Sequence, residues 1–375
     1  MNELQPLRVS VLDTLDAFHA LATEWRALHD GSDANSPFLT WEWLYHWTIT
    51  YLSDDRLWIL LFMDSDDRLR GIAPFCVRQK RVGPWATYRE VAFLGGRGVG
   101  SVYLDVIAAR GDKPSVLACL CNYLFLEAST EWDIVTLAPV PAESVTVDLL
   151  QEQFDIAGKV ASIIGHTCCP TMDLPPSIET YRGAMRPSLQ RSLQRKRRYL
   201  DQQGTVTYQR TRSNDDISAA LDTFSALHQK RWATRSRQGG AFRDSRFRAF
   251  HTEIAPLFHT RGWLDITFLC LNGSPVAGIY GYRHDRTYYY YLPGFDPEPA
   301  AKGSPGMLLL SYRIEEAIEE GCRRFDLLQG PAGYKTTWAQ RSTRCLSLRL
   351  YNRTWRALAL HVLETAKQGM KILLR

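Results

Sequence analysis

Residues 263–338 decide the fold of this chain and read WLDITFLCLNGSPVAGIYGYRH (263–284), TYYYYLPGFDPEPAAKGSPGMLLLSYRIEEAIEEG (287–321) and RRFDLLQGPAGYKTTW (323–338). The apolar patterns predict two strands joined by Asn272-Gly273, a third strand at TYYYY, a helix over 307–320 and a fourth strand at RRFDLL. An apolar strand here leads into a glycine-containing turn that begins a helix. The first N–H groups of a helix have no partner within the helix and carry partial positive charge, so this turn is predicted to bind phosphate.

The predicted phosphate-binding turn reads Lys302-Gly303-Ser304-Pro305-Gly306. Ser304 suits the N-cap and Pro305 the first helical position, while the glycines would let a pyrophosphate approach the backbone and Lys302 adds charge. Upstream, LPGFDPEP carries three prolines, which predicts that the strand stops pairing there and leaves backbone groups free for a ligand such as pantetheine. Taken alone, the turn is equally consistent with an ordinary capped helix after a loop.

Length and composition indicate a globular protein of two domains. The chain has 375 residues, 45% of them hydrophobic, with 11 Trp and 17 Tyr, which is enough for two cores. It contains no apolar run of 18 residues and no leader-like N-terminus, so we expect a cytoplasmic protein without a transmembrane segment. The eight Cys have no metal-finger spacing and are predicted to be reduced thiols, with no metal site.

Charge differs sharply between the two halves. Residues 1–180 carry a balance of −11, and residues 181–375 carry +16. A basic second half favours an anionic ligand such as a phosphate-bearing cofactor, and it would also attract the acidic first half. The balance does not favour DNA or another nucleic acid over a small phosphorylated ligand.

The two halves follow a similar predicted plan. The first half reads as strand 7–12, helices 15–29 and 41–51, a hairpin, strands 88–94 and 102–107, helix 114–127, strand 133–137, helix 143–153 and strand 159–166. The second half follows a linker at 172–181 and reads as a basic helix to about residue 200, a strand at 204–210, helices 215–232 and 247–259, and the stretch quoted above. Gly71 and Gly278 take equivalent places after the two hairpin turns, which indicates a tandem duplication.

Several short motifs, taken in order, resemble a known family. They are Ser36-Pro37-Phe38-Leu39-Thr40-Trp41-Glu42-Trp43, Tyr103-Leu104-Asp105, His228-x-x-Arg231-Trp232, Asp326-Leu327-Leu328-x-Gly330 and Tyr334-Lys335-x-x-Trp338. Together they resemble the CelD/BcsL-like acetyltransferases, a GNAT branch named for its association with cellulose and other exopolysaccharide synthesis. That branch is related to the FemAB peptidyltransferases, which are two GNAT domains in tandem. The usual GNAT pattern Arg/Gln-x-x-Gly-x-Gly/Ala is met only approximately by the turn at 302–306.

The resemblance implies an α/β fold with two tandem GNAT-like mixed sheets flanked by helices, followed by a C-terminal helix. Residues 176–350 would bind acetyl-CoA or another acyl-CoA, and residues 351–375 would form the last helix. Residues 1–175 have no comparable Gly-Pro helix start, so they are expected to shape the acceptor pocket in the cleft between the halves. The implied activity is acyl transfer from a thioester to an amine or hydroxyl, for example on an exopolysaccharide precursor or another small-molecule acceptor.

Acyl transfer requires a base, a stabilised oxyanion and a proton for the leaving thiolate. By the resemblance, Tyr334 takes the place of the tyrosine that protonates the CoA sulfur, although tyrosine is also a common packing residue. His228, with a pKa suited to neutrality, and Asp326, in an apolar strand, are the two candidates for the base. A half-buried helix histidine is the plainer interpretation of His228. The predicted acceptor-binding residues are Trp41, Asp105, Arg231, Trp232, Lys335 and Trp338, of which Lys335 could equally be a surface charge.

Two other functions stay open. An aminoacyl-tRNA-dependent transferase like the Fem proteins would use the basic cluster Arg191, Arg195, Lys196, Arg197 and Arg198 to grip tRNA, although a solvated helix face explains that cluster as well. A non-catalytic partner of a polysaccharide synthase is the third hypothesis. A dinucleotide-binding fold is excluded because Gly96-x-Gly98-x-Gly100 precedes a predicted strand, and a serine hydrolase because no Gly-x-Ser-x-Gly elbow exists.

The predicted C-terminal helix, 354–374, is amphipathic and basic. It places Trp355, Leu358, Val362 and Leu363 on one side. We expect this side to dock on the domain rather than to insert into a membrane.

Overall fold

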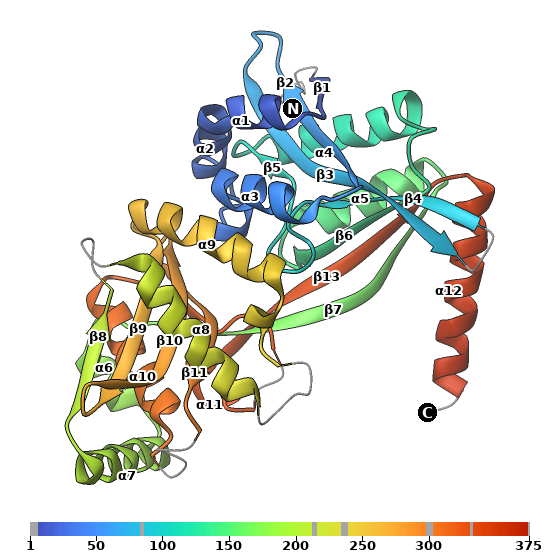
Figure 1. Cartoon of the computed structure of the whole chain (residues 1–375). Helices are drawn as coiled ribbons and strands as arrows, with labels where there is room; N and C mark the ends of the chain where they lie inside the picture. The colour runs from blue at the N-terminus through green and yellow to red at the C-terminus, as the bar shows by residue number, and fades with distance from the viewer. Residues whose placement is uncertain are drawn as a thin grey trace. The chain divides into compact units, whose positions relative to one another are not determined.

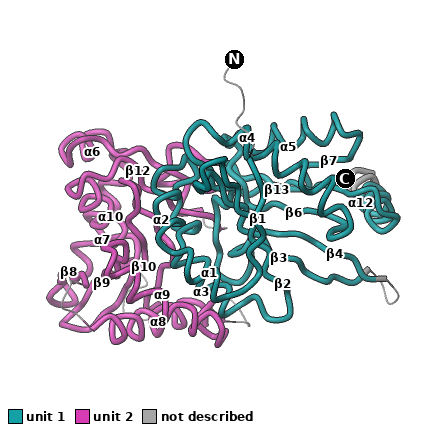
Figure 2. The backbone as a smooth tube through the Cα atoms, turned by 90° about the horizontal axis from the view of Figure 1, so that it is seen from above, with its two compact units in different colours: residues 1–168, 344–375 teal, residues 169–343 magenta. Residues whose placement is uncertain are grey.

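The computed structural model describes residues 7–82, 86–211, 216–233, 239–297, 303–330 and 333–373 (Figure 1). These residues form two compact units (Figure 2). Unit 1 comprises residues 1–168 and 344–375, and unit 2 comprises residues 169–343. The unit boundaries fall inside strands β7 (Val160–Asp173) and β13 (Arg341–Tyr351), so each unit contains part of both strands.

Unit 1 has a mixed sheet with the strand order β1-β2-β3-β4-β6-β13-β7, and β5 pairs with β3. Strands β4 and β6 are parallel, whereas the pairs β1–β2, β2–β3, β3–β4 and β6–β13 are antiparallel. The strands are β1 (Arg8–Leu12), β2 (Arg56–Met63), β3 (Leu69–Val82), β4 (Ala86–Phe93), β5 (Ile107–Ala108) and β6 (Ile134–Pro141). The helices are α1 (Leu15–Ala20), α2 (Ala22–Asp30), η1 (Pro37–Leu39), α3 (Trp41–Tyr51), α4 (Lys113–Asn122), η2 (Tyr123–Glu127), α5 (Val145–Ile156) and α12 (Trp355–Leu373).

Unit 2 has a second mixed sheet with the order β7-β12-β11-β10-β9-β8. Strands β11 and β12 are parallel, and the other neighbouring pairs are antiparallel. Its strands are β8 (Val206–Arg210), β9 (Leu264–Leu271), β10 (Ser274–His284), β11 (Thr287–Phe295) and β12 (Arg324–Asp326). Its helices are α6 (Ile178–Ala184), α7 (Pro187–Gln203), α8 (Ile217–Ala233), η3 (Ala241–Arg243), α9 (Ser245–Thr260), α10 (Pro305–Glu319) and α11 (Lys335–Trp338).

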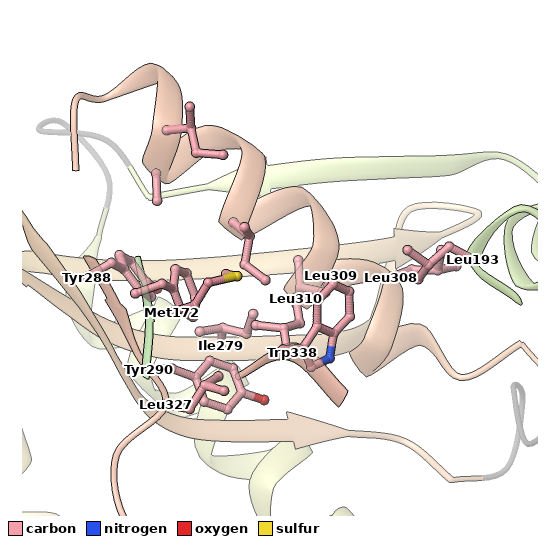
Figure 3. Packing of buried hydrophobic residues seen from close by; sticks show 14 of the residues in the cluster. Met172, Leu193, Ile279, Tyr288, Tyr290, Leu308, Leu309, Leu310, Leu327 and Trp338 are labelled. Atoms are coloured by element: carbon pink, nitrogen blue, oxygen red, sulfur yellow. The ribbon is translucent and has the colours of Figure 1, made fainter. Parts of the chain in front are cut away.

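The pleat of the unit 2 sheet sends alternate residues to two helical layers. On one face, Ile279 and Tyr290 join the core beneath α10, where Leu309 and Trp338 are also buried (Figure 3). On the other face lie Tyr280, Tyr282 and Tyr291, against aromatic side chains of α8 and α9. The predicted fold class, mixed α/β sheets flanked by helices, is therefore confirmed.

Some predicted elements differ from the structure. The predicted strand 102–107 is mostly irregular, because Tyr103 has a left-handed φ of 59°, which a strand cannot contain, and only Ile107–Ala108 pair. The predicted linker 172–181 contains the end of β7 and the start of α6, which Ser177 caps by accepting a hydrogen bond from the Thr180 N–H. The expected helix 15–29 is two helices, and strand β13 was not predicted although its alternating apolar residues are typical of a strand.

Candidate functional site: a cavity at the start of helix α10

A cavity of about 370 Å³ opens in unit 2 where β11 separates from β12. β11 pairs with β12 only over Thr287–Tyr289, but it stays paired with β10 as far as Phe295. The expectation that the prolines end this strand is therefore wrong on the β10 side, since Pro293 lies within it. The cavity is lined by Arg231, Tyr290, Pro293, Phe295, Asp296, Pro297, Ser304, Pro305, Gly306, Met307 and Tyr334.

The start of α10 forms one wall of the cavity. Ser304 has a left-handed backbone with φ 44°, and its carbonyl accepts the Met307 N–H at 2.9 Å. Because Pro305 has no N–H, the amide of Gly306 is the first donor that the helix directs toward its N-terminal end. A Cβ at Gly306 would lie 3.4 Å from the Phe295 ring, which is ordinary contact, whereas one at Gly303 would come within 2.6 Å of Leu200. Gly303 is thus required for packing against α7, and Gly306 lines the cavity.

A lysine from α7 reaches this helix start. Lys196 Nζ donates a hydrogen bond of 2.6 Å to Ser304 Oγ. Ser304 therefore does not cap α10 with its side chain, as the sequence predicted, but receives a cation from a segment about a hundred residues away. Burial, together with Arg195, lowers the pKa of the Lys196 amine. Lys302, the cation predicted at this turn, lies outside the described residues.

Arg231 of α8 brings a buried positive charge to the cavity. Its side chain is 7% exposed, and its Nη1 donates a 3.0 Å hydrogen bond to the Pro293 carbonyl. The guanidinium lies 5.4 Å from the Phe295 ring centre and 5.5 Å from that of Trp232. Its buried Nε has no hydrogen-bond partner, and no carboxylate of the described residues forms an ion pair with it. A buried cation without a negatively charged partner is costly, so an anionic ligand would be favourable here.

Among the described residues that line the cavity, Asp296 contributes a carboxylate. Lys230 of α8 forms an ion pair with Asp296, with an Nζ–Oδ2 distance of 2.5 Å. This pairing offsets the negative charge of Asp296 beside the cavity, so Asp296 does not cancel the attraction of Arg231 for an anion.

His228 is the neighbour of Arg231 one helical turn earlier, but it is fully engaged. Its Nδ1 lies 2.9 Å from the Pro293 carbonyl, and its Nε2 accepts the Ala241 N–H at 3.3 Å. Burial lowers the pKa of His228 to about 4, so the ring is neutral at neutral pH. A Cβ on Gly294 would clash with the His228 backbone at 2.7 Å, which shows how closely α8 approaches β11. Both ring nitrogens tie α8 to its surroundings, and the arrangement fits a structural histidine better than a base.

Two tyrosines meet at the cavity. Tyr334, the predicted acid, donates through its hydroxyl to the Tyr290 hydroxyl at 3.4 Å. Tyr290 is 2% exposed, and burial raises its pKa well above the usual value, so it keeps its proton. Tyr334 is therefore held by a neutral phenol at the cavity wall.

Lys335 and Asp326 lie together behind this wall. The Lys335 side chain is buried, and its Nζ donates to the carbonyls of Leu328 at 3.1 Å and Gln329 at 2.8 Å. Burial lowers the pKa of Lys335 to about 8, although the Asp326 charge works in the opposite direction. Asp326 is buried as well and accepts the Leu328 N–H at 2.8 Å. The possibility that Lys335 is a surface charge is wrong, because its ammonium holds the loop that follows β12.

The remaining predicted residues do not line the cavity. Trp338 is packed in the core beneath α10 (Figure 3), and Trp232 stacks on Arg231. Trp41 and Asp105 belong to unit 1. Trp41 is buried, donates to the Phe18 carbonyl at 2.9 Å and stacks on Tyr45. Asp105 is buried and bonded to Lys113, Ser144 and Thr146.

Sequence reasoning missed several cavity residues. Tyr290, Phe295 and Met307 line the cavity. In the sequence they look like ordinary core residues, because they follow only the alternation of a strand or the spacing of a helix. Lys196 was grouped with its basic neighbours, since the sequence does not show which of them faces α10. The described residues contain no group of three His, Cys, Asp or Glu side chains that could hold a metal ion.

The comparison with protein families covers the part of the chain that forms this site. Residues 187–336 match the family model described as acetyltransferase (GNAT) domain. This part of the chain is therefore similar to a GNAT acetyltransferase domain. It contains the start of α10, Arg231 and Tyr334, so the cavity lies within the matched region. The GNAT part of the predicted resemblance is confirmed, and the CelD/BcsL-like branch stays a prediction.

Solved structures share the fold of the whole chain at low sequence identity. FemX covers 94% of this chain and 99% of its own length with a TM-score of 0.61 and 10% identity. The C-terminal domain of a putative lysylphosphatidylglycerol synthetase from Agrobacterium fabrum covers 93% of this chain and 95% of its own length, with a TM-score of 0.53 and 13% identity. L-PGS from Bacillus licheniformis covers 92% of this chain and 96% of its own length, with a TM-score of 0.50 and 14% identity. No curated protein matches the sequence.

Proposed function

We propose that this protein transfers an acyl group from acyl-CoA, bound at the cavity of unit 2, to an amine or hydroxyl acceptor. The observation that carries the proposal is the buried Arg231 guanidinium that lines the cavity with the start of α10 and forms no ion pair with a carboxylate in the described ranges. Together with the Gly306 amide and Lys196, it provides positive charge for a phosphate-bearing donor on a GNAT domain. By the sequence resemblance, the acceptor class is an exopolysaccharide precursor.

In this proposal the acceptor attacks the thioester carbonyl and a tetrahedral oxyanion forms. Its collapse breaks the carbon–sulfur bond, and the leaving thiolate takes the proton of Tyr334, whose hydroxyl lies at the cavity wall. His228 is left out as the base because both of its ring nitrogens are engaged. Asp326 stays the candidate for the base, and Lys335 fixes the loop that follows it.

Donor binding is tested by thermal unfolding with acetyl-CoA and longer acyl-CoAs at millimolar concentration. We expect the melting temperature to rise in the wild type, because a ligand that binds only the folded state stabilises it. Gly306→Asp should abolish the rise, since a carboxylate there repels phosphate. Gly183→Asp is the matched control, because a Cβ at Gly183 in α6 meets nothing within 4 Å. A wild-type melting temperature that no acyl-CoA changes would overturn the proposal.

A second candidate function, aminoacyl-tRNA-dependent transfer, is favoured by the exposed face of α7. Arg191, Arg195 and Arg198 are exposed, and none of them pairs with a carboxylate in the part of the chain that the structure describes. α7 packs against α10 through the Lys196 contact, so this charge lies beside the start of α10. A gel shift with charged tRNA that disappears when the three arginines are neutralised would support this function. A wild-type protein that shifts no tRNA would rule it out.

A further inference from the structure

The C-terminal helix α12 packs on unit 1 through one face. Ala357 is fully buried and Leu360 is 8% exposed, and both lie in a small core with Ile134 and Tyr351. Tyr351 donates from its hydroxyl to Glu364 Oε2 at 2.7 Å, and Arg349 pairs with the same carboxylate. These contacts fix which side of α12 faces the sheet.

The opposite face of α12 is apolar and exposed. Trp355 is 66% exposed, Leu358 52%, Val362 66% and Leu363 47%. The prediction that these four side chains dock on the domain is wrong, because residues 357, 360, 361 and 364 make that contact instead. Positions 355, 358 and 362 follow the helical repeat, so they form one continuous stripe on the solvent side.

In the part of α12 whose side chains the structure describes, the charged residues are Arg356 and Glu364. Because Glu364 is bonded to Arg349 and Tyr351, the acid belongs to the packed face. The Arg356 guanidinium lies 5.2 Å from the centre of the exposed Trp355 ring. An exposed indole with a cation on it suits the boundary between lipid headgroups and acyl chains.

The size of the stripe favours a lipid surface over a protein partner. A stable protein interface buries about 800 Å² on each partner and involves roughly 20–30 residues. The described stripe offers four large side chains on a single helix. No helix in the described ranges is long and apolar enough to cross a membrane, and α12 already uses its other face for packing. A helix of this kind lies in the plane of an interface.

We propose that α12 binds the surface of an anionic lipid bilayer through Trp355, Leu358, Val362 and Leu363, with Arg356 contacting the headgroups. This inference rests on α12 alone and is independent of the donor site. Because Glu364 is turned toward Arg349, the described side chains beside the apolar stripe include the cation Arg356 and no acid, which is complementary to a negatively charged membrane surface.

The experiment is flotation of the full-length protein with phosphatidylglycerol/phosphatidylcholine vesicles. We expect the wild type to float at low salt and to be released at high salt. Leu358→Glu combined with Val362→Glu should lower the vesicle partition coefficient at least tenfold. Arg356→Gln should lower it roughly fivefold, from about 1 kcal/mol per basic residue. Ile49→Glu, which changes an apolar side chain of α3 that is 54% exposed, is the matched control and should change nothing.

Three outcomes would overturn the proposal. The first is equal flotation of the wild type and the α12 double variant, with melting temperatures showing that both are folded. The second is equal binding to pure phosphatidylcholine vesicles, which would remove the role of charge. The third is a concentration-dependent dimer in sedimentation that the double variant abolishes, because the stripe would then be covered by a second copy.

Discussion

Helices α4 of unit 1 and α10 of unit 2 hold corresponding positions in the order of elements, but the charged side chains at their starts differ. In chain order α4 lies between the parallel strands β4 and β6, after the short strand β5, and α10 lies between the parallel strands β11 and β12. At the start of α4, Asp112 pairs with Arg70, and Lys113 pairs with Asp105. At the start of α10 stand Ser304 with Lys196, a glycine amide and Arg231.

The difference teaches how to tell a structural charge from a binding one. Asp105 is 3% exposed and accepts hydrogen bonds from Lys113, Ser144, Thr146 and its own neighbour Val106, so its charge is fully satisfied. Arg231 is similarly buried, but among the described residues its guanidinium bonds to the Pro293 carbonyl and its Nε finds no partner. In unit 1 the protein's own carboxylates fill the place beside the helix start. In unit 2 we propose that a ligand supplies the negative charge.

The largest effect is expected from Asp105→Ala. The change leaves Lys113, whose side chain is 13% exposed, beside two hydroxyls without its carboxylate, and breaking a buried pair costs about 3–5 kcal/mol. Urea unfolding should show this loss in the free energy of unfolding, while acetyl-CoA affinity of the folded protein stays unchanged. An Asp105→Ala protein of normal stability and reduced donor affinity would reverse the roles that we assign to the two units.

His228 predicts the acid sensitivity of unit 2. Its pKa is about 4 in the folded protein against 6.5 for a free imidazole, so below pH 6.5 the unfolded chain binds the proton first. The stabilisation is therefore complete above pH 6.5 and falls by about 3 kcal/mol as the pH drops to 4. Denaturant unfolding as a function of pH measures this slope. His228→Gln should reduce the slope and leave the part that comes from His251, whose pKa burial lowers to about 3. The same change at the exposed His166 should leave the slope intact, and an unchanged slope in His228→Gln would contradict the assignment.

The parts of the fold and of the candidate site that could be predicted are those that depend on residues close together in the sequence. The order of strands and the Ser304-Pro305-Gly306 turn are local patterns, so the fold and the helix start at the cavity could be predicted from the sequence. The sequence does not show that Trp41 and Asp105 are buried and hydrogen-bonded, because a buried, satisfied residue and an exposed functional one look alike in a sequence. Likewise, only the tertiary structure shows that Lys196, among five basic residues of α7, reaches Ser304.

Arg231→Met tests the unmatched charge directly. The thioether retains the apolar packing on Phe295 and Trp232 but removes the positive charge from the cavity. We expect acetyl-CoA affinity to fall roughly thirtyfold, or about 2 kcal/mol, with stability equal to or above that of the wild type. Isothermal titration and thermal melting measure the two effects. If Arg231→Met is strongly destabilised and binds the donor normally, Arg231 resembles Asp105 and the comparison between the two helix starts fails.

Lys196→Met should have the smallest effect and tests how far the positive charge at α10 extends. Lys196 is only part-buried, and its contact with Ser304 Oγ leaves two of its three ammonium protons for a phosphate. A partly solvated cation contributes about 1 kcal/mol, so acetyl-CoA affinity should fall roughly fivefold. The matched control is Arg198→Met, which removes an exposed charge from the same helix. Titrations at low and high salt distinguish a direct contact of Lys196 from a long-range effect of the basic helix. A long-range effect would lower the acetyl-CoA affinity of both variants equally and would disappear at high salt. Equal losses would therefore show that the basic helix acts as a whole, whereas a loss confined to Lys196→Met would place this one side chain at the start of α10 as a ligand of the donor.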